Sequence, residues 1–320
     1  MMSGSGTGFR AGLVLSLAGG VIGVRAFFSP DCFRGACSVS GPMSGALIAG
    51  SGQDSDQQQQ TPTTRPSVAP TLKTLADAQD ALLSRVVDTN GLVRYSLLQS
   101  DTALRSALDS LVSGYAELPT PAAENTNKRL AFWCNAYNVN VMNEVLATGL
   151  PKRVLDVDGF FDKRVIRVGR LDLTLNDLEN KYVRELGDPR IHAALNCAAV
   201  SCPALGRKAF RAETIDAQLD DLCVGWVNDT SRNRVDEATG TLHVSMIFKW
   251  FESDFTVKPY GSVTGFIRSF AKEDSAIGKH LKSRAKSGLV SIEYIEYDWT
   301  LNRAPEAEED KGRESGSDEG

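Results

Sequence analysis

One segment, residues 125–149 ("NTNKRLAFWCNAYNVNVMNEVLATG"), constrains the fold more than any other part of the chain. Trp133 and Tyr137 begin an apolar line at helical spacing, and apolar neighbours widen this line until little polar face remains. A helix that is apolar nearly all round is a buried helix, and Gly149 supplies its C-terminal stop. We therefore expect residues 125–149 to form a central helix, with the rest of one core packed around it.

The other periodic segments predict further helices and a few short strands. Apolar residues at helical spacing predict four helices, at residues 71–87, 101–118, 175–186 and 215–227, with Thr174 and Asp177 as a capping box for the third. Alternation predicts two hairpins and a closing strand, at residues 164–174, 234–245 and 288–302. Ser245 is predicted to cap a short aromatic helix at residues 246–255. Helices that lead the chain, with short antiparallel strands inserted, indicate an α+β domain.

Composition divides the chain into four parts. Residues 1–26 resemble a signal peptide, since Arg10 precedes an apolar run of 14 residues, which is long enough for a signal core and short for a membrane span. Residues 27–71 are a low-complexity linker or a transit-peptide-like segment. The folded domain is predicted at residues 72–303, ahead of an acidic tail at residues 304–320.

The presequence predicts a destination. We expect entry into the secretory pathway, with a plastid as the alternative because "RAFFSP" resembles the cleavage junction of two-part plastid presequences. Contact with a membrane is expected only if the N-terminal segment is retained.

Charge and motifs argue against several classes of partner. The tail carries seven acids and two bases, which equals the whole net charge of −5, so the remainder of the chain is neutral. Without a basic stripe the chain is not expected to bind nucleic acid. Neither G-x-G-x-x-G nor the P-loop pattern occurs in the predicted domain, and we predict no cofactor.

The segment at residues 192–205, "HAALNCAAVSCPAL", holds the candidate site. In one hypothesis Cys202 is a nucleophile, with Cys197 as the alternative, and His192 is its general base at the start of a buried strand. Asn135 or Asn138, which lie on one side of the central helix, would then orient the imidazole. This hypothesis predicts a cysteine-dependent hydrolase or acyl transferase.

Other interpretations of the same segment stay open. Cys197 and Cys202 could form a disulfide, either structural or redox-active, across the four residues that separate them. They could bind a metal with His192, although zinc wants four ligands and the paired C-x2-C knuckles are missing, so we predict no metal. His192 could instead be a core histidine tied to a backbone carbonyl, and the segment a packed turn of an interaction module.

The remaining polar and sulfur groups are assigned more simply. Tyr137, Glu179 and Asn196 are candidate substrate-binding residues, with Glu179 also able to orient His192. Cys134 and Cys223 lie on apolar helix lines and are predicted to be core residues. His243 and His280 are expected to have no role in a site, and Cys32 and Cys37 fall in the presequence or linker.

Five segments in the same order resemble the DUF547 family, a domain of unknown function: "FWCNAYNVNVMNEVL", "LTLNDLENKYVREL", "DPRIHAALNCAAVSCPAL", "IFKWFESDF" and "YDWTLN". The resemblance spans roughly Leu72 to Asn302 and implies no activity. Two functions follow from the residues alone. One is the cysteine-dependent hydrolase or acyl transferase, and the other is a binding or assembly module whose cysteines are structural or redox-active. In either case the expected partner is an unidentified small molecule or peptide.

Overall fold

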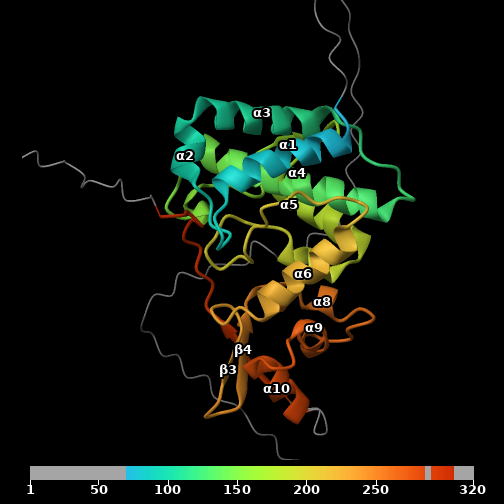
Figure 1. Ribbon diagram of the computed structural model, residues 1–320, viewed down its shortest axis with the longest axis vertical. Helices are drawn as coiled ribbons and strands as arrows, with labels where there is room; N and C mark the ends of the chain where they lie inside the picture. Colours follow the sequence, from blue (N-terminus) through green and yellow to red (C-terminus); the bar gives the residue numbers. More distant parts are fainter. Residues whose placement is uncertain (1–69, 285–289, 306–320) are drawn as a thin grey trace, which may run out of the picture. The chain divides into compact units, whose positions relative to one another are not determined.

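The computed structural model describes residues 70–284 and 290–305, which form an α+β domain (Figure 1). The signal-like segment, the linker as far as residue 69 and the tail from residue 306 lie outside the described residues. Thr71 and Ala304, at the two predicted boundaries, belong to the folded domain. Thr71 caps the first helix, and the backbone N–H of Ala304 donates to Val93 O at 2.9 Å.

The first half is a group of helices around a central one. Its members are α1 (Leu72–Val86), α2 (Tyr95–Ser100), α3 (Thr102–Glu117) and α4 (Thr126–Ala147). In α4, 16 of 22 residues are buried, and the run from Leu130 to Met142 is buried without a break. α3 packs against both α1 and α4, and Figure 1 shows the three lying alongside one another. The prediction of a central buried helix is confirmed.

The hairpin predicted at residues 164–174 is present. β1 (Ile166–Val168) pairs antiparallel with β2 (Leu171–Leu173). The turn residues Gly169 and Arg170 have φ of 61° and 66°, as a two-residue turn with positive φ at both positions requires. The turn is fixed because the N–H of Gly169 donates to Tyr115 O of α3 at 2.8 Å.

The helix predicted at residues 175–186 is instead three short turns of different pitch. α5 (Leu175–Asp177) begins at Thr174, whose hydroxyl accepts from Asp177 N. A π-helical turn, η2 (Leu178–Val183), and a 3-10 turn, η3 (Arg184–Leu186), follow. In η2 the N–H of Arg184 bonds to Glu179 O, five residues back, which widens the helix. A widened turn of this kind is frequent at functional sites.

The second half contains the larger sheet. After α6 (Ile215–Val227), β3 (Arg234–Asp236) and β4 (Thr241–Ser245) form the predicted hairpin. β5 (Ser291–Ile295) lies on the other side of β4 and runs parallel to it, so this pairing differs from the antiparallel arrangement that we predicted.

The parallel pairing has a topological reason. Among the described residues between β4 and β5 are four short helices: α7 (Ile247–Trp250), α8 (Glu252–Phe255), α9 (Val263–Phe270) and α10 (Ala276–Ser283). Such a crossover brings the chain back to the end of the sheet at which β4 begins, and a strand parallel to β4 has to start there.

After β5, residues 297–304, here called the closing segment, return to the first half of the domain. The N–H of Leu301 donates to Lys152 O at 2.8 Å, and the N–H of Val93 donates to Asn302 O at 2.9 Å. These bonds attach the closing segment to the first half of the domain.

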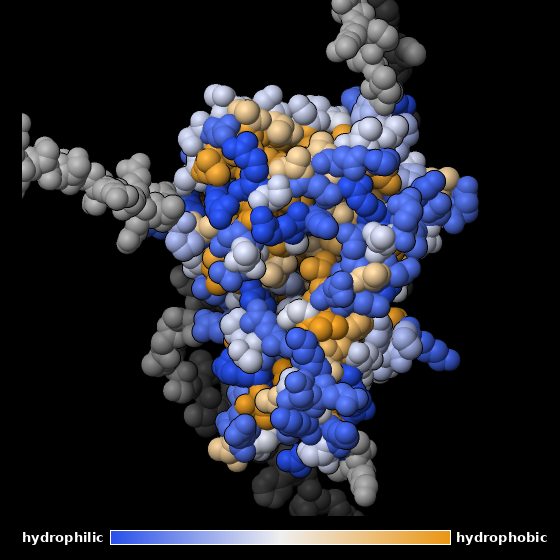
Figure 2. All heavy atoms as spheres, in the orientation of Figure 1, coloured by the Kyte–Doolittle hydropathy of each residue, from blue (hydrophilic) through white to orange (hydrophobic). Residues whose placement is uncertain are grey.

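The face in Figure 2 is largely hydrophilic, with apolar side chains gathered in smaller patches. Of the helices in residues 70–284 and 290–305, none combines the length and the apolar character needed to cross a bilayer.

Candidate functional site

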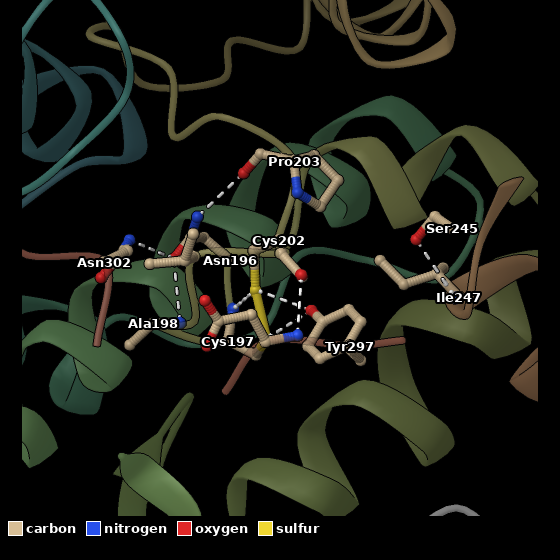
Figure 3. Close-up of a disulfide and its surroundings, with 12 residues drawn as sticks. Asn196, Cys197, Ala198, Cys202, Pro203, Ser245, Ile247, Tyr297 and Asn302 are labelled. Atoms are coloured by element: carbon tan, nitrogen blue, oxygen red, sulfur yellow. Dashed lines mark hydrogen bonds between the residues drawn. A yellow bond between two sulfur atoms is a disulfide. The ribbon is translucent and has the colours of Figure 1, made fainter. Parts of the chain in front are cut away.

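The two cysteines of the candidate segment form a disulfide. Cys197 and Cys202, whose Cα atoms are 6.3 Å apart, close a short loop that we call the cysteine loop, residues 196–203 (Figure 3). Within it Ala198 has φ of 61°, a left-handed conformation that non-glycine residues seldom adopt. The disulfide alternative of the sequence analysis is therefore the one found in the structure.

The side chain of Asn196 closes the same loop without the sulfurs. Its Nδ2 donates to Pro203 O at 3.0 Å, across the base of the loop. Its Oδ1 accepts from the N–H of Ala198 at 2.9 Å and from Asn302 Nδ2 of the closing segment at 3.0 Å. Asn196 is 5% exposed, so these bonds form away from water. The amide, predicted to bind substrate, instead holds the loop and joins it to the closing segment.

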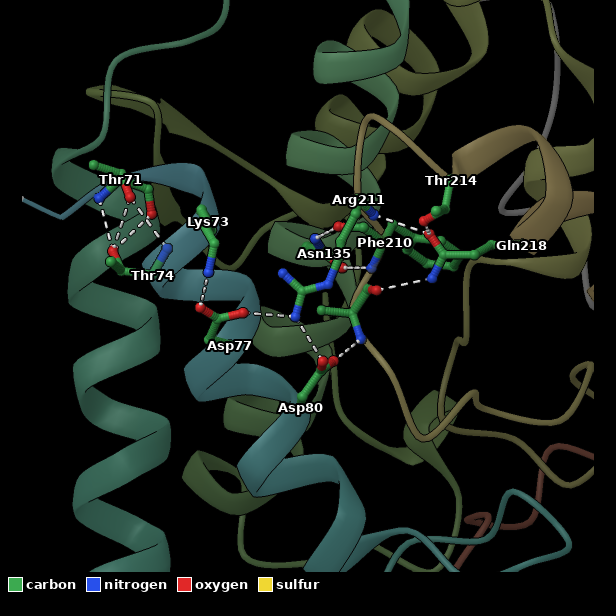
Figure 4. A network of polar contacts seen from close by, with 11 residues as sticks. Thr71, Lys73, Thr74, Asp77, Asp80, Asn135, Phe210, Arg211, Thr214 and Gln218 are labelled. Atoms are coloured by element: carbon green, nitrogen blue, oxygen red, sulfur yellow. Dashed lines mark hydrogen bonds and ion pairs between the residues drawn. The ribbon is translucent and has the colours of Figure 1, made fainter.

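The two asparagines of α4 are backbone clamps. Asn138 Oδ1 accepts from Asn196 N, and its Nδ2 donates to Ala194 O, both at 2.9 Å. Asn135 clamps Phe210 in the same way, with both bonds at 2.8 Å (Figure 4). Buried amides of this kind need partners, since an unpaired one costs about 1–3 kcal/mol. Asn135 or Asn138 was predicted to orient His192, and the structure uses both to position loops on α4.

The hydroxyl of Tyr297 lies against the disulfide. It is 3.1 Å from Cys197 Sγ and 3.2 Å from Cys202 Sγ (Figure 3). The backbone N–H of Cys197 also donates to Cys202 Sγ, at 3.1 Å. Burial raises the pKa of Tyr297 well above its ordinary value, so this hydroxyl keeps its proton and acts as a donor. Both sulfurs therefore face a hydrogen-bond donor.

A small hollow opens beside Tyr297. Its lining includes Ser201, Arg232 and Glu296. The guanidinium of Arg232 donates to Cys202 O at 2.7 Å and to Val200 O at 3.0 Å, so its charge is fixed against the cysteine loop. The enclosed space is only about 10 Å³, which is room for roughly one water molecule and not for a large ligand.

His192 belongs to a different cluster. Its Nε2 lies 2.8 Å from Asp254 Oδ2, and Asp254 also accepts two bonds of 2.7 Å from Arg184. The ring stacks on Phe251 at 4.3 Å between centroids. Burial lowers the pKa of His192, whereas Arg184 and His192 hold the pKa of Asp254 well below its usual range despite burial. His192 is thus a core histidine, as one of the alternatives held, but it is tied to a carboxylate rather than to a backbone carbonyl.

The local structure at His192 also differs from the prediction of a strand. His192 lies in a 3-10 helix, η4 (Pro189–Ala193), which begins where the Asp188 carboxylate accepts from Arg190 N at 3.0 Å. An aspartate cap followed by proline favours the start of a helix. Within the described residues, no hydrogen bond joins His192 to either cysteine. A nucleophile–base pair of the kind we predicted is therefore not formed.

Glu179 is buried between the disulfide with Tyr297 and the cluster that holds His192 and Asp254. It is 6% exposed and accepts from the Tyr137 hydroxyl at 3.2 Å. Burial raises the pKa of Glu179 to about 7, although Arg184 and Tyr137 lower it. Its charge also raises the pKa of Tyr297. Glu179 was predicted to orient His192 or bind substrate, and Tyr137 to bind substrate. The structure pairs them with each other.

The remaining cysteines and histidines that the structure describes do not come together in one site. Cys134 and Cys223 are buried free thiols whose pKa values are raised by burial, as predicted for core residues. His243 faces the Glu293 carboxylate at 3.6 Å across β4 and β5. In the part of the chain that the structure describes, no group of three or more metal-ligating side chains could hold an ion. Cys32 and Cys37 lie outside that part.

The sequence did not predict three residues that contact His192 or the cysteine loop: Arg232, Asp254 and Tyr297. Asp254 and Tyr297 lie in "IFKWFESDF" and "YDWTLN", two of the five segments that resemble the DUF547 family. Asp254 is 62 residues from His192, and Tyr297 is 95 residues from Cys202. The family resemblance therefore drew attention to the segments that hold Asp254 and Tyr297, but it did not predict which residues these two contact.

Comparison with known proteins gives one match. Residues 121–227 match a family model described as "Protein of unknown function, DUF547". This range holds α4, both cysteines and His192, and it is shorter than the region of resemblance noted from the sequence. No curated protein and no solved structure matches the chain.

Proposed function

The chain contains a DUF547 domain over residues 121–227, a family whose description names no activity, and we propose that this domain is a thiol–disulfide switch. In this proposal the Cys197–Cys202 bond opens and closes in the folded domain. Its state controls how firmly the closing segment is docked.

The observation that carries the proposal is the set of backbone bonds between the cysteine loop and the closing segment. Val200 N donates to Thr300 O at 2.8 Å, and Ser201 N donates to Asp298 O at 3.2 Å. Asn302 N donates to Ala198 O at 3.0 Å. The disulfide therefore spans the residues to which the closing segment binds, so a change in the loop reaches the closing segment directly.

The loop is also suited to reversible chemistry. Cys197 and Cys202 are 5 residues apart, and closing so short a loop stabilises a fold by only about 2 kcal/mol through chain entropy. The Asn196 side chain already joins the two ends of the loop. After reduction the thiols would stay close together, so the bond can form again without refolding.

The hydrolase or acyl transferase predicted from the sequence stays a prediction. It needs a free thiolate with a base in hydrogen-bond reach, and His192 Nε2 is instead held by Asp254. The expected partner becomes a thiol, carried by a small molecule or a peptide. The secretory or plastid destination predicted from the presequence would expose the cysteines to oxidants.

Amide hydrogen exchange tests the switch. The full chain, with Cys32→Ser and Cys37→Ser so that only one disulfide can form, is compared oxidised and reduced. We expect the N–H groups of Val200, Ser201 and Asn302 to exchange faster after reduction, because their bonds depend on the loop. The N–H of Gly169, which bonds to Tyr115 O far along the chain, is the internal control and should not change.

Equal protection of these amides in both states would contradict the proposal. Iodoacetamide labelling at mildly acidic pH tests the hydrolase alternative on the reduced chain. A nucleophilic thiolate would be labelled preferentially there, whereas an ordinary thiol reacts slowly.

A further inference from the structure

We infer that the disulfide has a fixed polarity: an incoming thiolate attacks Cys197 Sγ, and Cys202 leaves as a thiolate stabilised by the Tyr297 hydroxyl. The substrate is a thiol reductant, either a small thiol or a protein dithiol. This inference rests on the proposed switch and assigns Tyr297 as a catalytic residue of that site.

The two cysteine residues differ in exposure. Cys202 is 2% exposed, whereas Cys197 is only partly buried. Thiol–disulfide exchange requires the attacking thiolate to reach one sulfur, and the rate depends on which sulfur is reached. Access therefore favours attack at Cys197.

The two sulfurs also differ in how well each is stabilised as a thiolate. Tyr297 has one hydroxyl proton and can donate to only one sulfur at a time. The backbone N–H of Cys197 is fixed on Cys202 Sγ at 3.1 Å, so Cys202 can receive two donors and Cys197 one. Hydrogen bonds to a thiolate lower its pKa, and a thiol of lower pKa leaves faster. Stabilisation thus favours Cys202 as the leaving group.

Arg232 holds the backbone of the cysteine loop on the side of Cys202. Its guanidinium donates to Cys202 O and Val200 O and pairs with the Asp229 carboxylate, and its charge lowers the pKa of Tyr297. Arg232 is a positioning residue, since its hydrogen bonds go to oxygen atoms rather than to sulfur.

The chemistry balances over two steps. In the first, the reductant thiolate forms a bond to Cys197 Sγ, the Cys197–Cys202 bond breaks, and its electron pair stays on Cys202 Sγ. Tyr297 donates a hydrogen bond and keeps its proton. In the second, another thiolate of the reductant attacks the reductant's sulfur in the mixed disulfide, and Cys197 leaves as a thiolate. The two protons lost by the reductant thiols end on the two cysteines, and the reductant becomes a disulfide.

Mapping the mixed disulfide tests the polarity. The oxidised full chain, carrying Cys32→Ser and Cys37→Ser, is treated briefly with glutathione, quenched with N-ethylmaleimide, and analysed by tandem mass spectrometry. We expect glutathione on Cys197 and maleimide on Cys202. Glutathione on Cys202, or spread equally over both, would overturn the inference.

A matched pair of variants tests Tyr297. Tyr297→Phe keeps the ring that packs against Trp250 and Trp299 and removes only the hydroxyl. We expect it to slow reduction by glutathione about tenfold, as the loss of one hydrogen bond to a charged group implies, and to raise the pKa of the Cys202 thiol. Tyr294→Phe, a change in β5 beside Lys249, is the control and should leave the rate unchanged.

An unchanged rate in Tyr297→Phe would overturn the role of the hydroxyl. A disulfide that glutathione and dithiothreitol reduce only after unfolding would overturn the proposed switch itself, and the polarity with it. Ready reduction with the label on Cys202 would overturn the polarity alone.

Discussion

Reducing the Cys197–Cys202 disulfide should lower the free energy of unfolding less than removing the Asn196 side chain does. The two perturbations act on the same cysteine loop but through different groups. Their comparison tests whether the two ends of the loop stay together when the sulfurs separate, which reversible switching requires.

The magnitudes follow from the contacts. The disulfide closes a loop with a sequence separation of 5, which the chain-entropy relation converts to about 2 kcal/mol. Asn196→Ala removes three buried hydrogen bonds, to Pro203 O, from Ala198 N and from Asn302 Nδ2. At about 1 kcal/mol each these give about 3 kcal/mol, and the partners left unpaired in a buried region make the cost larger rather than smaller.

The assay is urea unfolding followed by far-UV circular dichroism. The full chain with Cys32→Ser and Cys37→Ser is measured oxidised, reduced with a phosphine, and as oxidised Asn196→Ala. Unfolding near pH 6 keeps thiolates scarce, so the buried thiols do not exchange with the disulfide. We expect a loss of about 2 kcal/mol on reduction and of at least about 3 kcal/mol in the variant.

A loss above about 4 kcal/mol on reduction would refute the reasoning, since a short loop cannot supply it entropically. So would an Asn196→Ala variant that is as stable as the parent. Either result would mean that the disulfide, and not the amide, holds the cysteine loop.

Two further predictions concern the buried charges, each checked by unfolding free energies at several pH values. Asp254→Asn should cost about 3 kcal/mol at pH 7, because it leaves Arg184 and His192 without their carboxylate. The folded pKa of Asp254 lies below its unfolded value, so its contribution is present above about pH 5 and lost on acidification. A variant with the parent's pH dependence would contradict this assignment. The pKa of Glu179 is raised to about 7, so the folded parent should lose stability as pH rises from about 4 to 7. Glu179→Gln should remove that loss, worth about 3 kcal/mol, and equal profiles would show that Glu179 is not the group responsible.

The helices that the sequence predicted well are long and carry apolar residues at helical spacing. α1, α3, α4 and α6 were found because apolar residues recur every three or four positions, and Gly149 marked the end of α4. α2 was missed since its 6 residues are too few to show a period. The π-helical turn η2 was missed because the same residues suit a regular helix, and tertiary packing, here the burial of Leu178 and Val183, can override that preference.

In the candidate site, likewise, the sequence predicted contacts between near neighbours in the chain and missed contacts between distant residues. The disulfide was among the alternatives because Cys197 and Cys202 are neighbours in sequence. The partners of His192 and of the sulfurs were not predicted, since Asp254 and Tyr297 reach them across long stretches of chain. Pairing at that distance is decided by how the elements pack, and a single sequence carries no local pattern for it.

The redox equilibrium of the folded chain tests the central claim most directly. The Cys32→Ser, Cys37→Ser chain is equilibrated in dithiothreitol buffers of graded potential, and free thiols at Cys197 and Cys202 are counted by alkylation and mass spectrometry. A switch predicts one two-electron transition, the same curve from the oxidised and reduced directions, and a midpoint above about −300 mV. A midpoint below about −300 mV, or reduction that occurs only when the domain unfolds, would contradict the account and make Cys197–Cys202 a structural bond.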